Sequence, residues 1–538
     1  MYGPALCFEL PVGECDWEGI VDMKKKLIIM ISVVLIVLLA GGTAAFLLLG
    51  DRNGEEDEFL PTAADSDAAD FNVNAVNLEA EKLTLYFFGQ EIPVTQEVLG
   101  AVNSKLKRNI NTEIQFKFIL DMPDKYLEKI KSVISSGLPC DAFYYSSASG
   151  TGLETLANEG YIADLTELFP QYAPNYFKQF SRDDIDAARI NGKVYAVPER
   201  IPDAHRNCAI VRQDLMEKYD IPDIKSYDDY ELYLKTIKEK EPNMLPMNFF
   251  DTSIRLFADM YGYVVLDYDL GLVYKWDDPD VKIQAWEQTP VFKDCLNRIK
   301  SWRDKGYVMK SVGIAQLNVN MITSGKWASF IGETGDQISF NTLLRTGGIT
   351  EWNYKAYQLH DGYSVRLNPL KIGMAINAKS ANAERVLMFI DWLESSQDNY
   401  DLYMYGIKGK NYVEKEDYIE PLEKINVFFY WGWKEPLRNI DYERANAPGM
   451  KEEMTQYYEL IKEKTKYSPL NGFRPDYSGV GPIKDSRLIS FADMDRNIYL
   501  GDYDESKVDA YIKKQKDAGV DNMIAEVQRQ AERFRAAH

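Results

Sequence analysis

The sequence predicts an α/β protein in which parallel strands alternate with helices. Three observations indicate this class: the first ordered segments follow the pattern strand, helix, strand; the next segments continue it; and the second half of the chain repeats it. Alternation of this kind folds as a mostly parallel sheet with helices on its faces. A chain of 538 residues has room for about two to four compact units.

The first unit begins with an apolar strand over Lys82–Phe88, which stops at Gly89. Residues Pro93–Asn109 then space their valines and leucines along one face of a helix. Residues Glu113–Leu120 alternate apolar and polar side chains, as a half-buried strand does. Strand, helix and strand in this order predict the start of a doubly wound parallel sheet.

The following segments repeat the alternation. We expect a helix over Lys125–Gly137, a strand over Asp141–Ser146 and a helix over Gly152–Gly160, with a glycine ending each helix. Three later segments show the same features, namely a strand leading into a helix, a helix and a strand: Cys208–Asp220, Lys293–Gly306 and Lys326–Gly332. Trp302 and Trp392 occupy apolar positions of helices and are expected in the core.

The N-terminal region contains three lysines followed by 23 residues without a charge, Leu27–Leu49. Residues 1–22 are interpreted as a mis-called start before Met23, and residues 23–50 as a signal or a membrane anchor. The apolar run reaches roughly 34 Å as a helix, which favours an anchor because a membrane core is about 30 Å thick. Positive charge before the run places the following residues outside the cell. Cleavage after the small residues "GGTAA" is the alternative.

Residues 51–78 are interpreted as a disordered acidic tether, because carboxylates and small residues predominate there and cannot form a core. The whole chain has a net charge of −21, which repels nucleic acids and favours neutral or cationic ligands.

Cysteine and histidine patterns do not predict a metal or a cofactor. Beyond the N-terminal region, Cys140, Cys208 and Cys295 are widely spaced and are expected to be buried apolar residues. The three histidines have no ligand spacing, and no phosphate-binding loop or nucleophile elbow occurs in the sequence. Acidic clusters in "LDYDLG", "WDDPD" and "GDYDES" lack the EF-hand spacing and are interpreted as solvated turns.

Six strings in a fixed order carry a family resemblance. They are Ser135–Ser146, Leu156–Pro174, Ile190–Glu199, Ile210–Ile221, Ile322–Glu333 and Gly373–Leu393. In this order they resemble the extracellular solute-binding proteins (family 1, oligosaccharide type) of ABC importers. Tyr403–Val413 and Asn471–Asp476 resemble a Firmicute lipoprotein branch of that family with a C-terminal extension. That branch has a lipid-bearing cysteine where Gly42 and Thr43 stand here, so an uncleaved helix would replace the lipid.

The resemblance implies a two-lobe α/β fold of the periplasmic-binding-protein type (type II), preceded by the N-terminal transmembrane or signal helix. Residues 79–203 and 356–396 would form the N-terminal lobe, and residues 204–355 and 397–538 the C-terminal lobe with the extension. The protein would be no enzyme: it would capture a small-molecule solute, first of all an oligosaccharide, and deliver it to permease subunits while anchored on the extracellular face of the cell membrane. A peptide receptor, a secreted glycoside hydrolase and a tethered sensor or adhesion module are the alternatives.

Candidate ligand contacts lie where strands end, because α/β sheets bind ligands beyond the carboxyl ends of their strands. We expect Phe88 and Gln90 there after the first strand, and Tyr144 and Tyr145 at the end of the strand 141–146. Core or surface packing is the alternative for all of them.

The crossing between lobes and the C-terminal region supply further candidates. Glu199 and Arg200 would reach the ligand from the hinge unless they form an interlobe salt bridge, and the resemblance implies ligand contact for Glu333 and Thr334. Strand geometry would place Trp431 and Trp433 on one face as a platform for sugar rings, with packing as the alternative. Arg474 would bind a carboxylate or hydroxyl group, or form a closing salt bridge.

Overall fold

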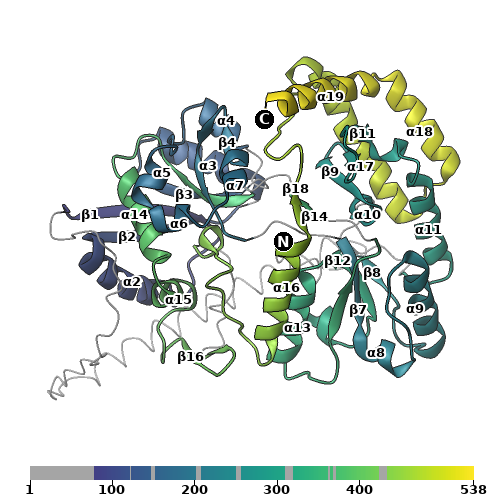
Figure 1. Ribbon diagram of the computed structural model, residues 1–538, viewed down its shortest axis with the longest axis horizontal. Coiled ribbons are helices and arrows are strands. Elements are labelled where there is room, and N and C mark those ends of the chain that lie inside the picture. Colours follow the sequence, from purple (N-terminus) through teal and green to yellow (C-terminus); the bar gives the residue numbers. More distant parts are fainter. Residues whose placement is uncertain are drawn as a thin grey trace, which may run out of the picture. The chain divides into compact units, whose positions relative to one another are not determined.

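The computed structural model describes residues 78–121, 123–146, 152–201, 207–249, 256–308, 319–360, 364–366, 371–422 and 433–537. The predicted start and anchor, and nearly all of the predicted tether, lie outside these residues. Within the described part of the chain, no helix is both long and apolar enough to cross a membrane. Strands and helices alternate along it, which confirms the predicted α/β class (Figure 1).

The first sheet has five strands in the order β2-β1-β3-β15-β6. Its strands are β1 (Glu81–Phe88), β2 (Thr112–Ile119), β3 (Ala142–Ser146), β15 (Ile372–Ile376) and β6 (Ala196–Pro198). β1 runs parallel to β2 and β3, whereas β15 runs antiparallel to β3 and β6. The predicted parallel start of the chain is therefore confirmed.

Helices cover this sheet with apolar faces. The elements are α2 (Thr95–Ile110), α3 (Pro123–Ser135), α4 (Leu153–Asn158), α5 (Leu168–Tyr172), α6 (Pro174–Phe177), α7 (Arg182–Ala187), α14 (Ala383–Leu393) and α15 (Gln397–Tyr405), with the short strands β4 (Arg189–Ile190) and β5 (Lys193–Val194). α2 buries Val98, Val102 and Leu106 at helical spacing, as its sequence predicts. Trp392 and Cys140 are also buried in this first core, as expected.

The first core includes residues that the sequence analysis assigned to the other lobe. Tyr403, Met404, Trp433 and Leu437 are buried in it, although the predicted boundary was at residue 396. α15, which carries the first two of these residues, packs against α2, and the Tyr403 ring lies 6.2 Å from the Phe116 ring of β2. The predicted boundary at 396 therefore differs from the packing, because described residues as far along the chain as Tyr442 pack with the first core.

The second sheet has four strands in the order β13-β7-β12-β8. They are β7 (Asn207–Arg212), β8 (Asn248–Phe249), β12 (Ser329–Glu333) and β13 (Tyr354–Tyr357). The associated helices are α8 (Gln213–Lys218), α9 (Tyr227–Lys240), α10 (Leu256–Met260), α11 (Phe292–Asp304), α12 (Val319–Thr323) and α13 (Asp336–Thr346). Trp302 is fully buried in the second core, and Cys208 and Cys295 are buried as predicted.

The C-terminal extension is helical and joins the second core. It comprises α16 (Met450–Lys464), α17 (Gly481–Leu500), α18 (Glu505–Asp517) and α19 (Val520–Ala537), with β18 (Thr465–Tyr467) paired to β14 (Ser364–Arg366). α19 packs on a three-stranded sheet of β9 (Tyr263–Asp267), β10 (Leu272–Lys275) and β11 (Gln284–Ala285). The remaining elements are β16 (Tyr412–Glu414), β17 (Ile419–Pro421) and the 3₁₀ turns η2 (Trp286–Gln288), η3 (Glu435–Leu437) and η4 (Ser478–Val480).

A buried ion pair fixes α17 to the second core. Arg487 donates two hydrogen bonds to Glu287, at 2.6 and 3.0 Å, and both side chains are fully buried. The Arg487 Nε also donates to the Leu270 carbonyl at 2.9 Å, and the guanidinium lies 4.8 Å from the Phe491 ring. The extension is thus an integral part of this core.

Candidate functional site

Several strand ends meet at one edge of the first sheet. β1 ends at Phe88 and the parallel β3 ends at Ser146. Ser146 pairs with Ile372 at the start of the antiparallel β15, and the Glu199 N–H donates to the Ile372 carbonyl at 3.1 Å. The carboxyl ends of β1, β3 and β6 therefore share this edge, which we call the first edge, as the sequence analysis expects.

Aromatic and acidic side chains lie together at the first edge. The Phe88 ring is stacked 6.4 Å from the Tyr144 ring, and the carboxylate of Glu435 in η3 lies close enough to the Tyr144 hydroxyl for its charge to act on it. Burial raises the pKa of Tyr144, and the negative charges of Glu435 and Glu199 raise it further. Burial also raises the pKa of Glu435, a residue that the sequence analysis missed.

The two tyrosines of β3 are more deeply buried than we expect for residues that contact a ligand. Tyr144 is 6% exposed and Tyr145 is 4% exposed. The Tyr145 hydroxyl accepts a hydrogen bond from the Leu153 N–H at 3.4 Å. Phe88 is half-buried and Gln90 is exposed, so these two side chains are the accessible ones of the four.

A second set of strand ends forms the second edge, on the other sheet. Glu333 at the end of β12 pairs with Asn207 at the start of β7. The Glu333 N–H donates to Asp336 Oδ2 at 2.8 Å, which ties the last residue of β12 to the first residue of α13. Burial, followed by the charge of Glu333, raises the pKa of Asp336 to about 7. The adjacent Thr334 is buried.

α16 brings another side chain to the second edge. The half-buried Tyr457 lies next to Thr334, and burial raises the pKa of its hydroxyl, as do the nearby charges of Glu333 and Asp336. Glu453 holds α16 against α13, because it accepts hydrogen bonds from Gln337 at 2.7 Å and from Asn341 at 2.6 Å. Figure 1 shows α13 and α16 side by side next to β12. Tyr457 is not among the predicted contacts, because its only signal in the sequence is a pair of tyrosines on a highly charged helix.

Two connections of the chain join the first edge to the second edge. β6 ends at Pro198 and β7 begins at Asn207, so this link runs from the first edge to the second. β13 ends at Tyr357 and β15 begins at Ile372, so a second link runs back between the same edges. Ligands of α/β sheets bind beyond the carboxyl ends of strands, which makes the region at these links the candidate site.

Comparison with known proteins identifies the family. The family model for bacterial extracellular solute-binding proteins matches residues 107–409. The chain belongs to this family. A carbohydrate ABC transporter substrate-binding protein of Streptococcus pneumoniae is 24% identical over 461 residues, which cover 84% of this chain and 90% of the relative.

Two further similarities are to proteins named for sugar binding or glycan transport. The polygalacturonan/rhamnogalacturonan-binding protein YtcQ of Bacillus subtilis is 21% identical over 438 residues, covering 78% of this chain and 86% of that protein. The crystal structure of the N-glycan transport solute-binding protein NgtS from Streptococcus pneumoniae superposes with a TM-score of 0.70 at 20% identity, covering 85% of this chain and 99% of NgtS. This likeness shows the two-lobe α/β fold of solute-binding proteins.

Trp433 of this solute-binding protein does not form an exposed stacking platform. It is 2% exposed, its indole Nε1 donates to the Tyr403 carbonyl at 3.2 Å, and its ring lies 5.6 Å from Phe116. The prediction of an exposed Trp433 is wrong, because its ring fills the first core between α15 and β2. Trp431 lies outside the described residues.

Arg200 is held in an ion pair. Its guanidinium contacts Asp441 at 2.5 Å and donates to the Gln179 carbonyl, and its N–H donates to the Arg438 carbonyl at 2.8 Å. The segment carrying Asp441 packs with the first core, and the other carboxylate oxygen of Asp441 lies 3.7 Å from Lys462 of α16, so Asp441 connects Arg200 to the C-terminal extension.

Arg474 lies near the first edge, where its charge lowers the pKa of Tyr145 against the larger effect of burial, which raises it. The segment before it connects the two halves of the protein. The Tyr467 hydroxyl donates to Asp184 of α7 at 2.8 Å, and Ser468 is hydrogen-bonded to Tyr274 of β10. The C-terminal extension therefore contributes to both sides.

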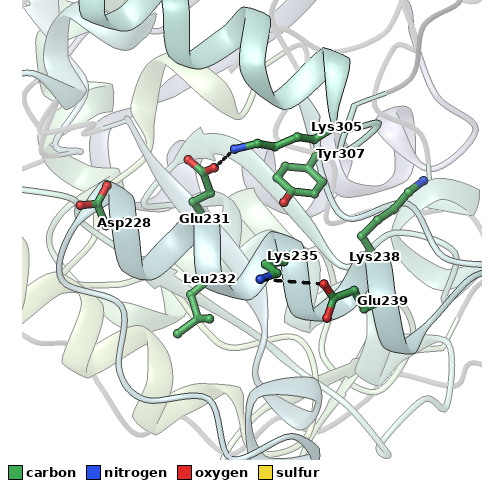
Figure 2. A pocket seen from close by; sticks show the side chains of 8 residues that line it. All are labelled: Asp228, Glu231, Leu232, Lys235, Lys238, Glu239, Lys305 and Tyr307. Atoms are coloured by element: carbon green, nitrogen blue, oxygen red, sulfur yellow. Dashed lines mark hydrogen bonds and ion pairs between the residues drawn. The ribbon is translucent and has the colours of Figure 1, made fainter.

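A surface hollow of about 670 Å³ lies elsewhere, along α9 (Figure 2). Its lining is mostly charged: Asp228, Glu231, Leu232, Lys235, Lys238, Glu239, Lys305 and Tyr307. Lys305 forms an ion pair with Glu231 of α9, and Lys235 pairs with Glu239 along α9. Most of its charged groups are already paired, and it lies along α9 away from the two edges (Figure 1), so we do not assign the solute to it.

The acidic turns considered for calcium use their oxygens locally. Asp278 accepts backbone N–H groups of Asp280 and Lys282 at 3.0 and 2.9 Å. Asp504 caps α18 by accepting the Lys507 N–H at 3.0 Å. Among the residues that the structure describes, no group of three or more His, Cys, Asp or Glu side chains is placed to hold a metal ion.

Proposed function

We propose that the protein is the extracellular solute-binding component of an ABC importer, which captures an oligosaccharide between its lobes and delivers it to a permease. The match of residues 107–409 to the solute-binding family carries this proposal. The names of the carbohydrate-binding relatives support a sugar as the solute.

The chemistry of the two edges suits a sugar. Carboxylates at Glu199 and Glu333 accept hydrogen bonds from hydroxyl groups, and Gln90 both donates and accepts them. The partly exposed rings of Phe88 and Tyr457 offer apolar faces for stacking. A solute that contacts both edges favours the closed arrangement of the lobes by its greater affinity for that state.

The lobes are assigned from the packing. The first lobe would contain residues 78–198 and 372–442, and the second lobe residues 207–357 and 443–537, since these ranges supply the separate cores. Solute capture requires no covalent step. Residues 23–50 would anchor the chain in the membrane, and residues 51–77 would act as the tether that keeps the receptor near its transporter.

A thermal-shift screen tests the proposal. The full-length chain, kept in a detergent without a sugar headgroup, is heated with a panel of oligosaccharides and peptides. An oligosaccharide at about 100 times its Kd stabilises the protein by about 2.7 kcal/mol, which raises Tm measurably. Calorimetry then gives Kd, and deletion of the gene should abolish uptake of that sugar.

Three outcomes contradict parts of the proposal. A shift with peptides alone identifies a peptide receptor, and shorter sugars appearing after prolonged incubation identify a hydrolase. Normal uptake after deletion, with binding intact, identifies a sensor or adhesion module.

A further inference from the structure

A segment of the C-terminal extension, residues 465–474, contacts both lobes, and we call it the strap. It begins with β18, which pairs in parallel with β14 on the link between β13 and β15. Leu470 and Phe473 pack in the core that α19 forms with the three-stranded sheet, where the Phe473 ring lies 5.5 Å from the Phe534 ring. The second lobe therefore holds the C-terminal half of the strap.

The strap is also bonded to the first lobe, at the start of α7. The Tyr467 hydroxyl donates to Asp184 Oδ1 at 2.8 Å and lies 3.1 Å from Ser181 Oγ. Ser181 and Asp184 form the capping box of α7, so Tyr467 docks on a turn that its own hydrogen bonds already order. The Asn471 side chain donates to the Asp183 carbonyl at 3.4 Å. Two residues of the strap thus dock on the first lobe.

The start of α7 lies near the first edge. The carbonyl of Gln179, two residues before Ser181, accepts a hydrogen bond from Arg200, which lies two residues after the end of β6. The strap therefore passes close to the carboxyl ends of the strands of the first sheet. Arg474, at the end of the strap, lies close enough to the Tyr145 hydroxyl of β3 for its charge to act on it.

The half-buried Arg474 side chain has donors available for a solute. Among the residues that the structure describes, none forms a hydrogen bond or an ion pair with this guanidinium. A guanidinium presents N–H groups in a fixed fork that binds two neighbouring oxygen atoms at once. Two adjacent hydroxyl groups of a sugar supply such a pair of oxygen atoms, and so does one carboxylate. Arg474 is therefore suited to bind a sugar at the first edge.

We propose, on the basis of the function proposed above, that Arg474 binds the oligosaccharide at the first edge and that Tyr467 is a positioning residue that holds the strap against this edge. Phe473 ties Arg474 to the second lobe, whereas Tyr467 and Asn471 keep the strap beside the first lobe. A solute that contacts both Arg474 and the first edge then meets groups that are already in place, which lowers the entropic cost of binding.

Calorimetry on the full-length chain tests the role of Arg474. The probe is the tightest ligand in a panel of maltotriose, cellotriose, mannotriose, chitotriose and trigalacturonate, of which the last distinguishes a carboxylate partner from a pair of hydroxyl groups. Arg474→Gln should raise Kd at least about tenfold. Arg474→Lys should recover only part of this loss, because lysine keeps the charge but lacks the fork.

A double-mutant cycle tests the positioning role. Tyr467→Phe keeps the ring but removes the hydroxyl that docks on Asp184, and Kd should rise at least about fivefold. Tyr467→Phe/Arg474→Gln should bind within about twofold of Arg474→Gln alone, because the strap then has no guanidinium to position. The control Tyr219→Phe removes a comparable bond, from the Tyr219 hydroxyl to Glu241 at 2.6 Å within the second lobe, and should leave Kd unchanged.

The outcomes separate this inference from the proposed function. Thermal unfolding without sugar should give similar Tm values for Tyr467→Phe and Tyr219→Phe, so that a change in Kd does not report a loss of fold. An unchanged Kd in Arg474→Gln, additive effects in the double variant, or equal effects of Tyr467→Phe and Tyr219→Phe would overturn the inference while sugar binding stays intact. Absence of binding of the wild type to every trisaccharide would instead overturn the proposed function, and this inference with it.

Discussion

Replacement of Arg487 by methionine is expected to destabilise the second core strongly. The guanidinium and the Glu287 carboxylate are both fully buried, and the pair makes two hydrogen bonds. Removing one partner of a buried pair costs about 3–5 kcal/mol because the other charge remains uncompensated. The variant also loses the bond from Nε to the Leu270 carbonyl.

The magnitude follows from the burial of Glu287. With a urea m-value of about 3 kcal/mol/M, a loss of about 4 kcal/mol lowers the unfolding midpoint by about 1.3 M. The double variant Arg487→Met/Glu287→Leu should recover most of this loss, because it leaves neither charge in the core. Tryptophan fluorescence suits the measurement, since the fully buried Trp286 directly precedes Glu287.

Arg496→Met provides the matched control on the same helix. Arg496 pairs with Asp493 at the surface, where both side chains are more than half exposed, so little change is expected. If Arg487→Met shifts the midpoint no more than Arg496→Met does, or if the double variant is as unstable as the single one, the assigned role of the buried charges is wrong.

Three further predictions concern the first core and the second edge. Burial raises the pKa of Glu394 from 4.5 to about 8. Between these pH values the native state keeps a proton that the unfolded state releases. The free energy of unfolding should therefore fall as the pH rises, by at most about 1.4 kcal/mol per pH unit. Glu394→Gln should lose this slope while keeping the hydrogen bond from Asn439, and Tm curves at pH 5–8 parallel to those of the wild type would contradict the assignment. Trp433→Ala should lower the free energy of unfolding in urea by about 3–5 kcal/mol, as expected for a large core residue. A loss below about 1 kcal/mol would contradict the burial of this ring. Tyr457→Ala should weaken the binding of the sugar found in the screen at least tenfold, as measured by calorimetry. If its affinity equals that of the control variant Tyr268→Ala, at an exposed tyrosine, Tyr457 does not belong to the site.

The periodicity of the sequence was sufficient to predict the elements of the first sheet. Local spacing of apolar residues reports which face of an element is buried, and the predicted strands around Lys82–Phe88, Glu113–Leu120 and Asp141–Ser146 all occur. The family strings supplied what periodicity does not contain, namely the pairing of two separate sheets in one two-lobe fold.

The burial of Trp433 depends on contacts with residues that are distant in the sequence. Alternation along a strand predicts that Trp431 and Trp433 share a face, but not whether that face is exposed. Phe116 and Tyr403 decide this, because they provide the apolar surface that covers Trp433. No local pattern around residue 433 reports those partners.

Glu435 and Tyr457 could not be singled out for a similar reason. Each lies among many residues of its own type, and only tertiary contacts distinguish it: the Tyr144 hydroxyl for Glu435 and Thr334 for Tyr457. The turn at Glu333 and Thr334 was within reach of the sequence, because the end of an apolar strand marks it directly.

The start of β1 determines where the membrane would pull on the receptor. The Glu81 N–H is bonded to the Asn111 carbonyl, and the Leu78 carbonyl accepts the Asn111 side chain at 2.7 Å, so the described chain is fastened to the first sheet from its first residues. In an anchored receptor, the tether would therefore restrict the motion of the first lobe and leave the second lobe free to move. The second lobe would then be the one that moves during closure, and the Glu333 end of β12 would approach the first lobe each time a solute binds.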